Sequence, residues 1–229
     1  MGILTLFTSN ASKIQSVFSP LATHLVPWYS RKIRNEQRKD IVGILISATD
    51  VCKVLLILLI VFFATIGNFI FVAYYGSALE PYYWLFVLLL TTMAFWMSFT
   101  AQGSYLFVSN TRSYNILLAC IICPFLPAVW LLSFQAGLNG AIIAFSLAQI
   151  LIGSGIFIKV LKDLSLHIWH GPVFYIIIPL SFLILVLCFP LYHILSLPLL
   201  VGMFVFLCIG VLLLAHKKLR EARALVHSL

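Results

Sequence analysis

Hydrophobic residues along this chain form long runs that are separated by short polar connections. The runs that contain no Asp, Glu, Lys or Arg are residues 54–72, 82–97, 116–134, 142–158, 173–191 and 197–215. Most of them approach the roughly 20 residues that cross a hydrocarbon core as a helix. Because a backbone in hydrocarbon must bond to itself, the runs predict helices, not strands. The pattern therefore predicts an all-α polytopic membrane protein.

About seven transmembrane helices are predicted, and they form one helical lobe over residues 1–229. Their expected ranges are 2–28, 41–75, 82–108, 114–134, 139–160, 172–191 and 197–216. The first range is polar in its middle, so we expect one face of that helix to meet a watery cavity. A helix lying in the membrane interface is the alternative for this range.

Composition agrees with a membrane location and excludes an ordinary soluble domain. The chain is 63% hydrophobic and 9% charged, whereas about a quarter of the residues of a soluble domain are charged. The formal net charge of +8 could suggest a nucleic-acid partner. The positions of the basic residues instead indicate how the chain is oriented in the membrane.

Nearly all of the 14 Lys and Arg residues fall in alternate connections of the predicted helices. These are Arg31, Lys32, Arg34, Arg38, Lys39, Arg112, Lys159, Lys162, Lys217, Lys218, Arg220 and Arg223. The connections between them, at 76–81, 135–139 and 192–196, contain no Lys or Arg. The positive-inside rule then predicts a cytoplasmic C-terminus and an outer N-terminus in the bacterial inner membrane. The bilayer and its anionic headgroups are the expected partners, and nucleic acid is not.

Residue types that would indicate an enzyme or a metal site are scarce. The chain has 6 acidic residues, and no paired carboxylates, phosphate loop or Ser/His/Asp grouping is evident. His167 and His170 flank Trp169 and are typical of a membrane interface. Cys120 and Cys123 lack the further ligands of a zinc site. We expect no catalytic activity, no bound metal and no cofactor.

Three ionisable residues are the candidates for a substrate pathway. Lys13 lies deep in the first predicted helix, roughly 22 Å from its inner end at a rise of 1.5 Å per residue. Asp50 and Lys53 are three residues apart on one helical face, where they can pair. A charge at membrane depth costs roughly 2.5–3.5 kcal/mol, which makes it a functional candidate. An ion pair that reaches the cytoplasmic headgroups is the open alternative for Asp50 and Lys53.

Small residues in the range 137–150 predict close helix packing. Gly137 belongs to an uncharged turn between two predicted helices. Gly140, Ala144 and Ala148 follow at helical spacing. In lipid, such a stripe lets two helix backbones approach each other.

Four segments of the chain also share their order with a known family. They are SKIQSVFSPLATHLVPWYSR (12–31), VAYYGSALEPYYWLFVLL (72–89), QGSYLFVSNTRSYNILL (102–118) and GLNGAIIAFSLAQI (137–150). Together they resemble the second, C-terminal lobe of polysaccharide flippases of the MOP superfamily, which also contains the MATE transporters. Beyond about residue 165 the likeness is limited to hydrophobic helices.

The resemblance implies alternating access around a cavity between two helical lobes. Members of the family typically flip undecaprenyl-pyrophosphate-linked oligosaccharides for polysaccharide or O-antigen (lipopolysaccharide) biosynthesis. Lys13 falls at the family's lysine position, so the resemblance also points to it as a pathway residue. Because the likeness covers one lobe, it implies a partner: an N-terminal lobe or a second copy of this chain.

Other functions fit parts of the pattern. A MATE-like drug or cation antiporter half needs a buried carboxylate, and only Asp50 is a candidate in the sequence. A membrane-embedded glycosyltransferase needs a sizeable outer loop, whereas the predicted outer loops are short. A non-transporting scaffold or a truncated remnant of a flippase is a further alternative.

Overall fold

The computed structural model describes most of the chain between its first and last predicted helices. The described residues are 23–165 together with Ser9, Lys13, Ser16, Pro20, Pro198, Gly202, Val205 and Ile209. Within 23–165, the side chains of residues 49–53, 55 and 64 are not described. Predicted helix 172–191 lies outside the described residues, and four helical positions represent predicted helix 197–216.

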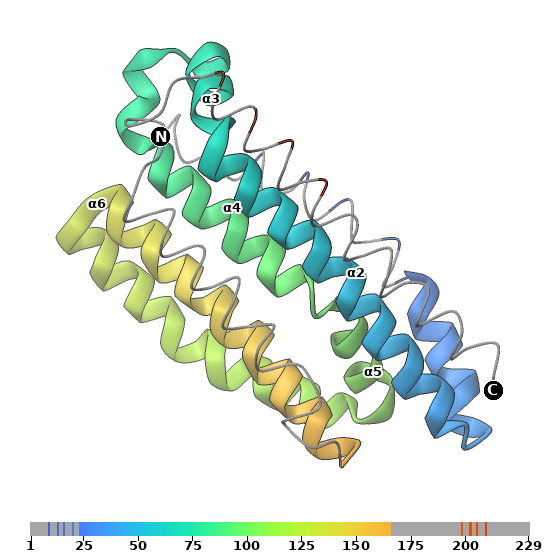
Figure 1. Ribbon diagram of the computed structural model, residues 1–229. Helices are drawn as coiled ribbons and strands as arrows, with labels where there is room; N and C mark the ends of the chain where they lie inside the picture. The colour runs from blue at the N-terminus through green and yellow to red at the C-terminus, as the bar shows by residue number, and fades with distance from the viewer. Residues whose placement is uncertain are drawn as a thin grey trace. The chain divides into compact units, whose positions relative to one another are not determined.

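The chain divides into two compact units. Unit 1 contains Met1–Thr49 and Leu88–His170, and unit 2 contains Asp50–Val87 and Gly171–Leu229. The elements, drawn in Figure 1, are α2 (Arg38–Thr65), α3 (Gly67–Tyr75), the 3-10 helix η1 (Ser77–Tyr82), α4 (Tyr83–Met97), α5 (Thr100–Ser109) and α6 (Thr111–Asp163).

The described part of the chain is helical and contains no strand. Ser77–Met97 and Thr111–Asp163 are each long and apolar enough to cross a membrane. The bent pair Leu56–Phe63 and Gly67–Tyr75 makes a third candidate span. These helices are compatible with a membrane protein, but the described residues do not confirm seven spans.

Unit 1 opens with a helix that continues past its predicted end at residue 28. Residues 23–34 are helical, and the turn that follows is held by backbone bonds, such as that from Gln37 N–H to Lys32 C=O (3.0 Å). Glu36 in this turn has a φ of 56°. α2 then begins at Arg38, before the predicted start at residue 41. The basic side chains are mostly exposed, so they extend into solvent while their backbone completes the helix ends.

α6 is a helical hairpin that bends at Gly137. This is its one residue with non-helical backbone angles, φ 58° and ψ −135°, a conformation open to glycine because it has no Cβ. Residues 111–136 and 138–163 therefore form two arms, which lie side by side in Figure 1. Each arm exceeds the roughly 20 residues that cross a hydrocarbon core. The predicted loop 135–139 is shorter in the structure, because the helix continues to both sides of Gly137.

Glycines on the second arm show how closely the two arms pack. A Cβ on Gly140 would overlap the carbonyl oxygen of Leu132, and a Cβ on Gly155 would lie 3.2 Å from the Leu117 side chain. These pairings run in opposite directions along the two arms, as an antiparallel hairpin requires. Further along the predicted stripe, Ala144 is 0% exposed and Ala148 is 8% exposed.

The predicted helix 82–108 is interrupted at Ser98 and Phe99, where α4 ends and α5 has not yet begun. The Ser98 hydroxyl donates to the Ala94 carbonyl (2.8 Å), and the Thr100 hydroxyl donates to the Met97 carbonyl (2.6 Å). Hydroxyls that bond to the preceding turn compete with the regular helix and bend it. Where the sequence predicts one helix over 82–108, the structure has the two helices α4 and α5. Beyond the break, the Phe99 ring packs on Phe157 of α6, with centroids 5.5 Å apart.

In unit 2, the predicted helix 41–75 is also broken. α2 and α3 meet at Ile66 with a bend of 68°. A Cβ on Gly67 would stand 2.5 Å from the Tyr83 hydroxyl, and this hydroxyl donates to the Phe63 carbonyl at 2.7 Å. Gly67 thus leaves the space in which a side chain from α4 bonds the backbone at the break. The hydrophobic run gave no sign of this contact, because Tyr83 approaches from another helix.

Gly140→Ala is expected to destabilise the fold by about 1–3 kcal/mol, because the new methyl group overpacks the backbone of the first α6 arm. Gly43→Ala is the matched control, since nothing lies within 4 Å of a Cβ at this helical position. The control is expected to be neutral or to gain up to about 1 kcal/mol from helix propensity. Thermal unfolding of both variants in detergent measures the difference. Equal stability of the two variants would contradict the close packing at Gly140.

Candidate functional site

Segments that are far apart in the sequence meet at one end of unit 1. The Arg38 guanidinium, at the start of α2, donates to the Leu164 carbonyl that follows α6. The Tyr105 hydroxyl of α5 donates to the Asp163 carboxylate at the end of α6 (2.8 Å). Because the arms of α6 are antiparallel, Arg112 at the helix start lies at this end too. We call this part of unit 1, residues 28–40, 109–112 and 159–164, the basic end.

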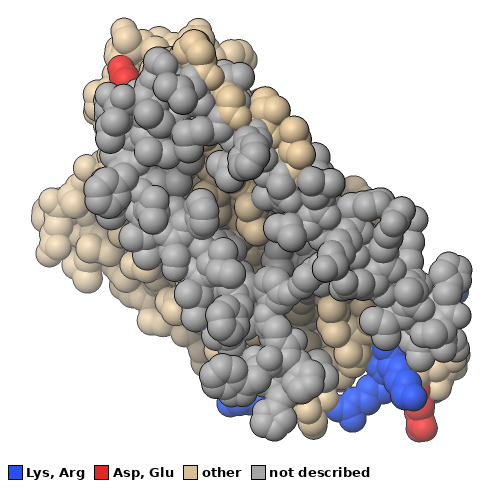
Figure 2. Space-filling view, in the orientation of Figure 1, with Lys and Arg blue, Asp and Glu red and all other residues tan. Residues whose placement is uncertain are grey.

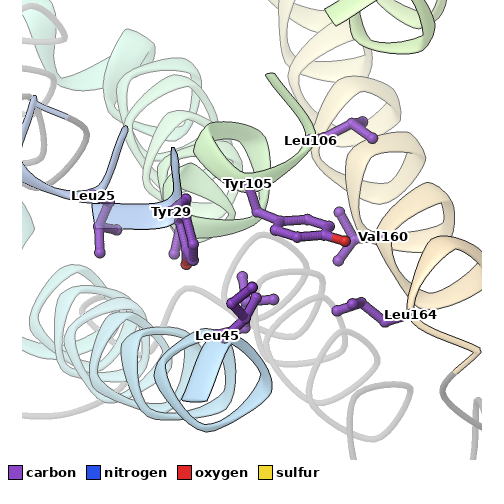
Figure 3. Close-up of a cluster of buried hydrophobic side chains, with 9 residues drawn as sticks. Leu25, Tyr29, Leu45, Tyr105, Leu106, Val160 and Leu164 are labelled. Carbon is purple, nitrogen blue, oxygen red and sulfur yellow. The ribbon is translucent and has the colours of Figure 1, made fainter. Parts of the chain in front are cut away.

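A buried cluster lies beside the basic end. Its residues come from the helix at 23–34 and from α2, α5 and α6. It consists of Leu25, Tyr29, Ile41, Leu45, Ala101, Tyr105, Leu106, Val160 and Leu164. Figure 3 shows Tyr105 reaching from α5 toward Val160 on α6, with Tyr29 and Leu45 beside it. The rings of Tyr29 and Tyr105 meet edge to face, with centroids 5.8 Å apart. Such aromatic pairs contribute about 0.5–1.5 kcal/mol beyond their buried area.

Tyr29 is the largest fully buried side chain of this cluster, with 0% of its surface exposed. Its hydroxyl has no hydrogen-bond partner among the described residues. Tyr29 follows the predicted span 2–28. Burial raises the pKa of its hydroxyl, and the neighbouring Tyr105 raises it further.

The acidic groups of the basic end are largely engaged, whereas most of its basic groups are exposed. Lys32 forms an ion pair with Asp40 (2.6 Å) and lies over the Trp28 ring, and Asp163 accepts from Tyr105. The exposed bases are Arg31, Arg34, Arg38, Lys39, Arg112, Lys159 and Lys162. In Figure 2 most of the visible blue surface lies along the lower edge of the view. Such a surface attracts anions, and Arg can bind a phosphate through two parallel hydrogen bonds.

Buried polar side chains mark a second feature of unit 1. They are Thr91, Thr92, Ser98, Gln102, Ser104, Ser146 and Gln149, on α4, α5, the break between them and the second arm of α6. Several hydroxyls bond to their own helix, as Thr92 does to the Leu88 carbonyl (2.7 Å). Ser146 Oγ and Gln149 Oε1 have no such partner among the described residues. Buried polar atoms without partners are expensive, so they point to a ligand, water or a facing helix.

The predicted pathway residues are not brought together by the described contacts. Lys13 is helical and exposed in unit 1, where the Ser16 hydroxyl donates to the Lys13 carbonyl (2.7 Å). Asp50 and Lys53 lie in α2 within unit 2, and their side chains are not described. The pairing of Asp50 with Lys53 therefore stays a prediction, as does the pathway role of all three residues.

Sequence reasoning missed the tyrosines and the buried amides. Gln102 and Gln149 stand within apolar stretches, and this pattern could have identified them as candidates. Tyr29 and Tyr105 carry no such signal, because an aromatic residue near a helix end is common in membrane proteins. Their contact depends on how three helices pack.

Comparisons of the chain with protein families, with curated proteins and with solved structures found no match. The candidate site must therefore be judged from its own residues.

Tyr105→Phe is expected to lower the free energy of unfolding by about 1 kcal/mol, because it removes the hydroxyl that bonds Asp163 and keeps the ring. The exposure of Asp163 keeps this loss small. Tyr74→Phe is the control, since Tyr74 is 79% exposed. Chemical denaturation in detergent compares the two variants. If the two substitutions cost the same, the bond from α5 to α6 does not contribute to stability.

Proposed function

We propose that this chain is a membrane-transport lobe that moves an undecaprenyl-pyrophosphate-linked oligosaccharide across the bacterial inner membrane. In this proposal it acts as the C-terminal half of a flippase for polysaccharide or O-antigen biosynthesis. The first half of the cavity comes from an N-terminal lobe or from a second copy of this chain. The N-terminus lies outside and the C-terminus lies in the cytoplasm.

The observation that carries the proposal is the interruption of two apolar helices, at Ile66 and at Ser98–Phe99. In hydrocarbon, irregular backbone is tolerated where protein or a water-filled cavity surrounds it. Discontinuous helices at membrane depth are typical of secondary transporters, whose substrates bind beside them. A purely structural membrane anchor has no need of such breaks.

The buried polar residues of unit 1 also support the proposal of a transported sugar. α5 follows one break immediately, and its residues Ala101–Leu106 are all buried, including Gln102 and Ser104. On α6, Ser146 and Gln149 are buried as well. The hydroxyl and amide groups of these residues are suited to a sugar, which binds proteins through hydrogen bonds of its hydroxyl groups.

The basic end suits the charged part of the proposed substrate. Its exposed Arg and Lys residues come from three places in the sequence and outnumber its acids. A pyrophosphate in the cytoplasmic leaflet would meet these residues first, given the orientation that the positive-inside rule predicts. Lys13 is the proposed cation further along the pathway.

The alternatives receive less support. A MATE-like antiporter half calls for buried carboxylates, and acidic side chains are scarce along the whole sequence, which has 6 of them. A scaffold or a truncated remnant leaves the two helix breaks and the buried amides without a use. Function is argued from the residues of a site and not from the fold. The buried amides and hydroxyls of unit 1 favour a polar ligand.

Coexpression tests the proposal directly. A flippase-deficient bacterial strain receives this chain together with a candidate N-terminal lobe, or either part alone, and surface polysaccharide is scored. We expect polysaccharide to return when both parts are present. Absence of polysaccharide in cells where both parts are correctly inserted in the inner membrane would refute the flippase proposal.

In the restored system, Lys13→Ala is expected to reduce surface polysaccharide about tenfold or more, because a hydrogen bond to a charged group is worth about 1.5–3 kcal/mol. Lys13→Arg keeps the positive charge and is expected to retain most of the activity. Western blotting of membranes controls for the amount of each variant. Full activity of Lys13→Ala would exclude Lys13 from the pathway.

A further inference from the structure

Two buried polar side chains on the second arm of α6 contain atoms that have no hydrogen-bond partner among the described residues. Ser146 is 2% exposed and Gln149 is 6% exposed. Their unpaired atoms are Ser146 Oγ and Gln149 Oε1. The two residues are three apart in the sequence, so they lie on one face of the helix. Because buried polar groups are nearly always hydrogen-bonded, two unpaired groups on one face point to a ligand.

Contacts further along the same face show which elements cover it. Gly153 lies one turn beyond the pair, and a Cβ on it would stand 3.3 Å from the Phe95 side chain and 3.0 Å from that of Phe99. Another turn on, the Ile156 side chain would lie 3.8 Å from a Cβ on Gly103. Later residues of α6 thus meet later residues of α4 and α5, so these segments of unit 1 run in the same direction.

The facing stretch of α4 offers the pair no hydroxyl donor. Level with the pair, α4 carries Thr91 and Thr92, which are both 1% exposed. Each donates its hydroxyl to the Leu88 carbonyl of its own helix, at 3.3 Å and 2.7 Å. A hydroxyl group has one hydrogen, so neither threonine can also donate to the amide oxygen across the contact. We call Thr91, Thr92, Ser146 and Gln149 together the polar seam.

We infer that the polar seam is a binding site for a sugar hydroxyl, which Ser146 and Gln149 contact when α4 and the second arm of α6 separate. The identification of the ligand as a sugar rests on the proposed function. A sugar hydroxyl both donates and accepts, so it satisfies the amide in either orientation and the serine hydroxyl as well. An ionised pyrophosphate only accepts and cannot bond the amide oxygen. The seam therefore contacts the oligosaccharide, and the pyrophosphate is left to the basic end.

The depth of the seam explains why its closed form is costly. Gln149 lies ten residues before Lys159, or roughly 15 Å at 1.5 Å per residue, which is half the thickness of a hydrocarbon core. Lipid offers no hydrogen bonds at this depth, so the unpaired atoms stay unpaired while the seam is closed. An amide that served helix packing alone would bond the facing helix. The cost of the closed seam favours its opening toward a hydroxylated ligand.

Thiol labelling tests whether the seam opens. Ser146→Cys is introduced into the full chain after its 5 native cysteines are replaced by alanine, and inner-membrane vesicles are treated with a small, charged, water-soluble thiol reagent. We expect Ser146→Cys to react at least about tenfold faster than the control Ala148→Cys.

Ala148 is a strict control because it is 8% exposed, more than Ser146. It belongs to the stripe of Gly140 and Gly155, which meets the first arm of α6 and not α4. Equal labelling rates at the two positions would overturn the opening of the seam.

The unfolding temperature in detergent tests whether the amide is a cost to the closed fold. Gln149→Leu removes an unpaired polar group at similar volume, so it is expected to raise the unfolding temperature by about 2 °C or more. Gln135→Leu is the matched control on the first arm, where Gln135 is exposed, and it is expected to change nothing. A lower unfolding temperature for Gln149→Leu would show that the amide supports the fold, which would overturn the site.

Surface polysaccharide in the restored strain tests the sugar contact itself. Gln149→Leu is expected to lower it at least about tenfold although the variant is the more stable protein, whereas Gln135→Leu keeps it. Wild-type polysaccharide with Gln149→Leu would overturn the sugar contact. Labelling and unfolding need no lipid-linked substrate, so a failure of the seam is distinguished from a failure of the proposed flippase activity.

Discussion

A peptide group surrounded by apolar material has no water to bond, so each break in an apolar helix needs substitute partners. At Ser98–Phe99 the substitute comes from the same segment, because the Thr100 hydroxyl donates to the Met97 carbonyl. At Ile66 the substitute comes from outside, because the Tyr83 hydroxyl bonds the Phe63 carbonyl. The described fold depends on these bonds, since they let helices change direction without leaving carbonyls unsatisfied.

The same requirement explains why polar side chains lie inside unit 1. Its apolar surface can face lipid, as the exposed Trp130 and Phe134 of the first α6 arm illustrate. The amides of Gln102 and Gln149 and the hydroxyls of Ser98 and Ser146 are instead buried. Buried polar side chains beside the break at Ser98–Phe99 connect the fold of unit 1 to the proposed transport of a sugar.

The basic end shows how charge and packing support each other. Tyr105 takes part in both, since its ring meets Tyr29 and its hydroxyl bonds Asp163. Arg38 likewise ties the start of α2 to the end of α6. With the acids partly occupied in this way, the remaining bases present a positive surface. Packing within the helices thus decides which charges remain for a partner.

The sequence by itself determined the class of the described structure and part of its outline. Unbroken apolar runs require helices, and Gly137 in an uncharged turn marks the place where α6 reverses. The small residues Gly140, Ala144 and Ala148 are periodic and could be recognised for that reason. In each case the physical cause is local: a run long enough to cross hydrocarbon, a backbone conformation that favours glycine, or side-chain size at helical spacing.

Only the tertiary structure decided where the helices break and which polar groups meet. The bond from Tyr83 to Phe63, the approach of Asn68 to Glu80 and the contact of Tyr29 with Tyr105 each join residues from different elements. Hydrophobic periodicity cannot predict such pairs, because it reports how apolar a face is and not which helix covers it. Of these pairs, the contact of Tyr29 with Tyr105 belongs to the candidate site, and for that reason the sequence did not predict it.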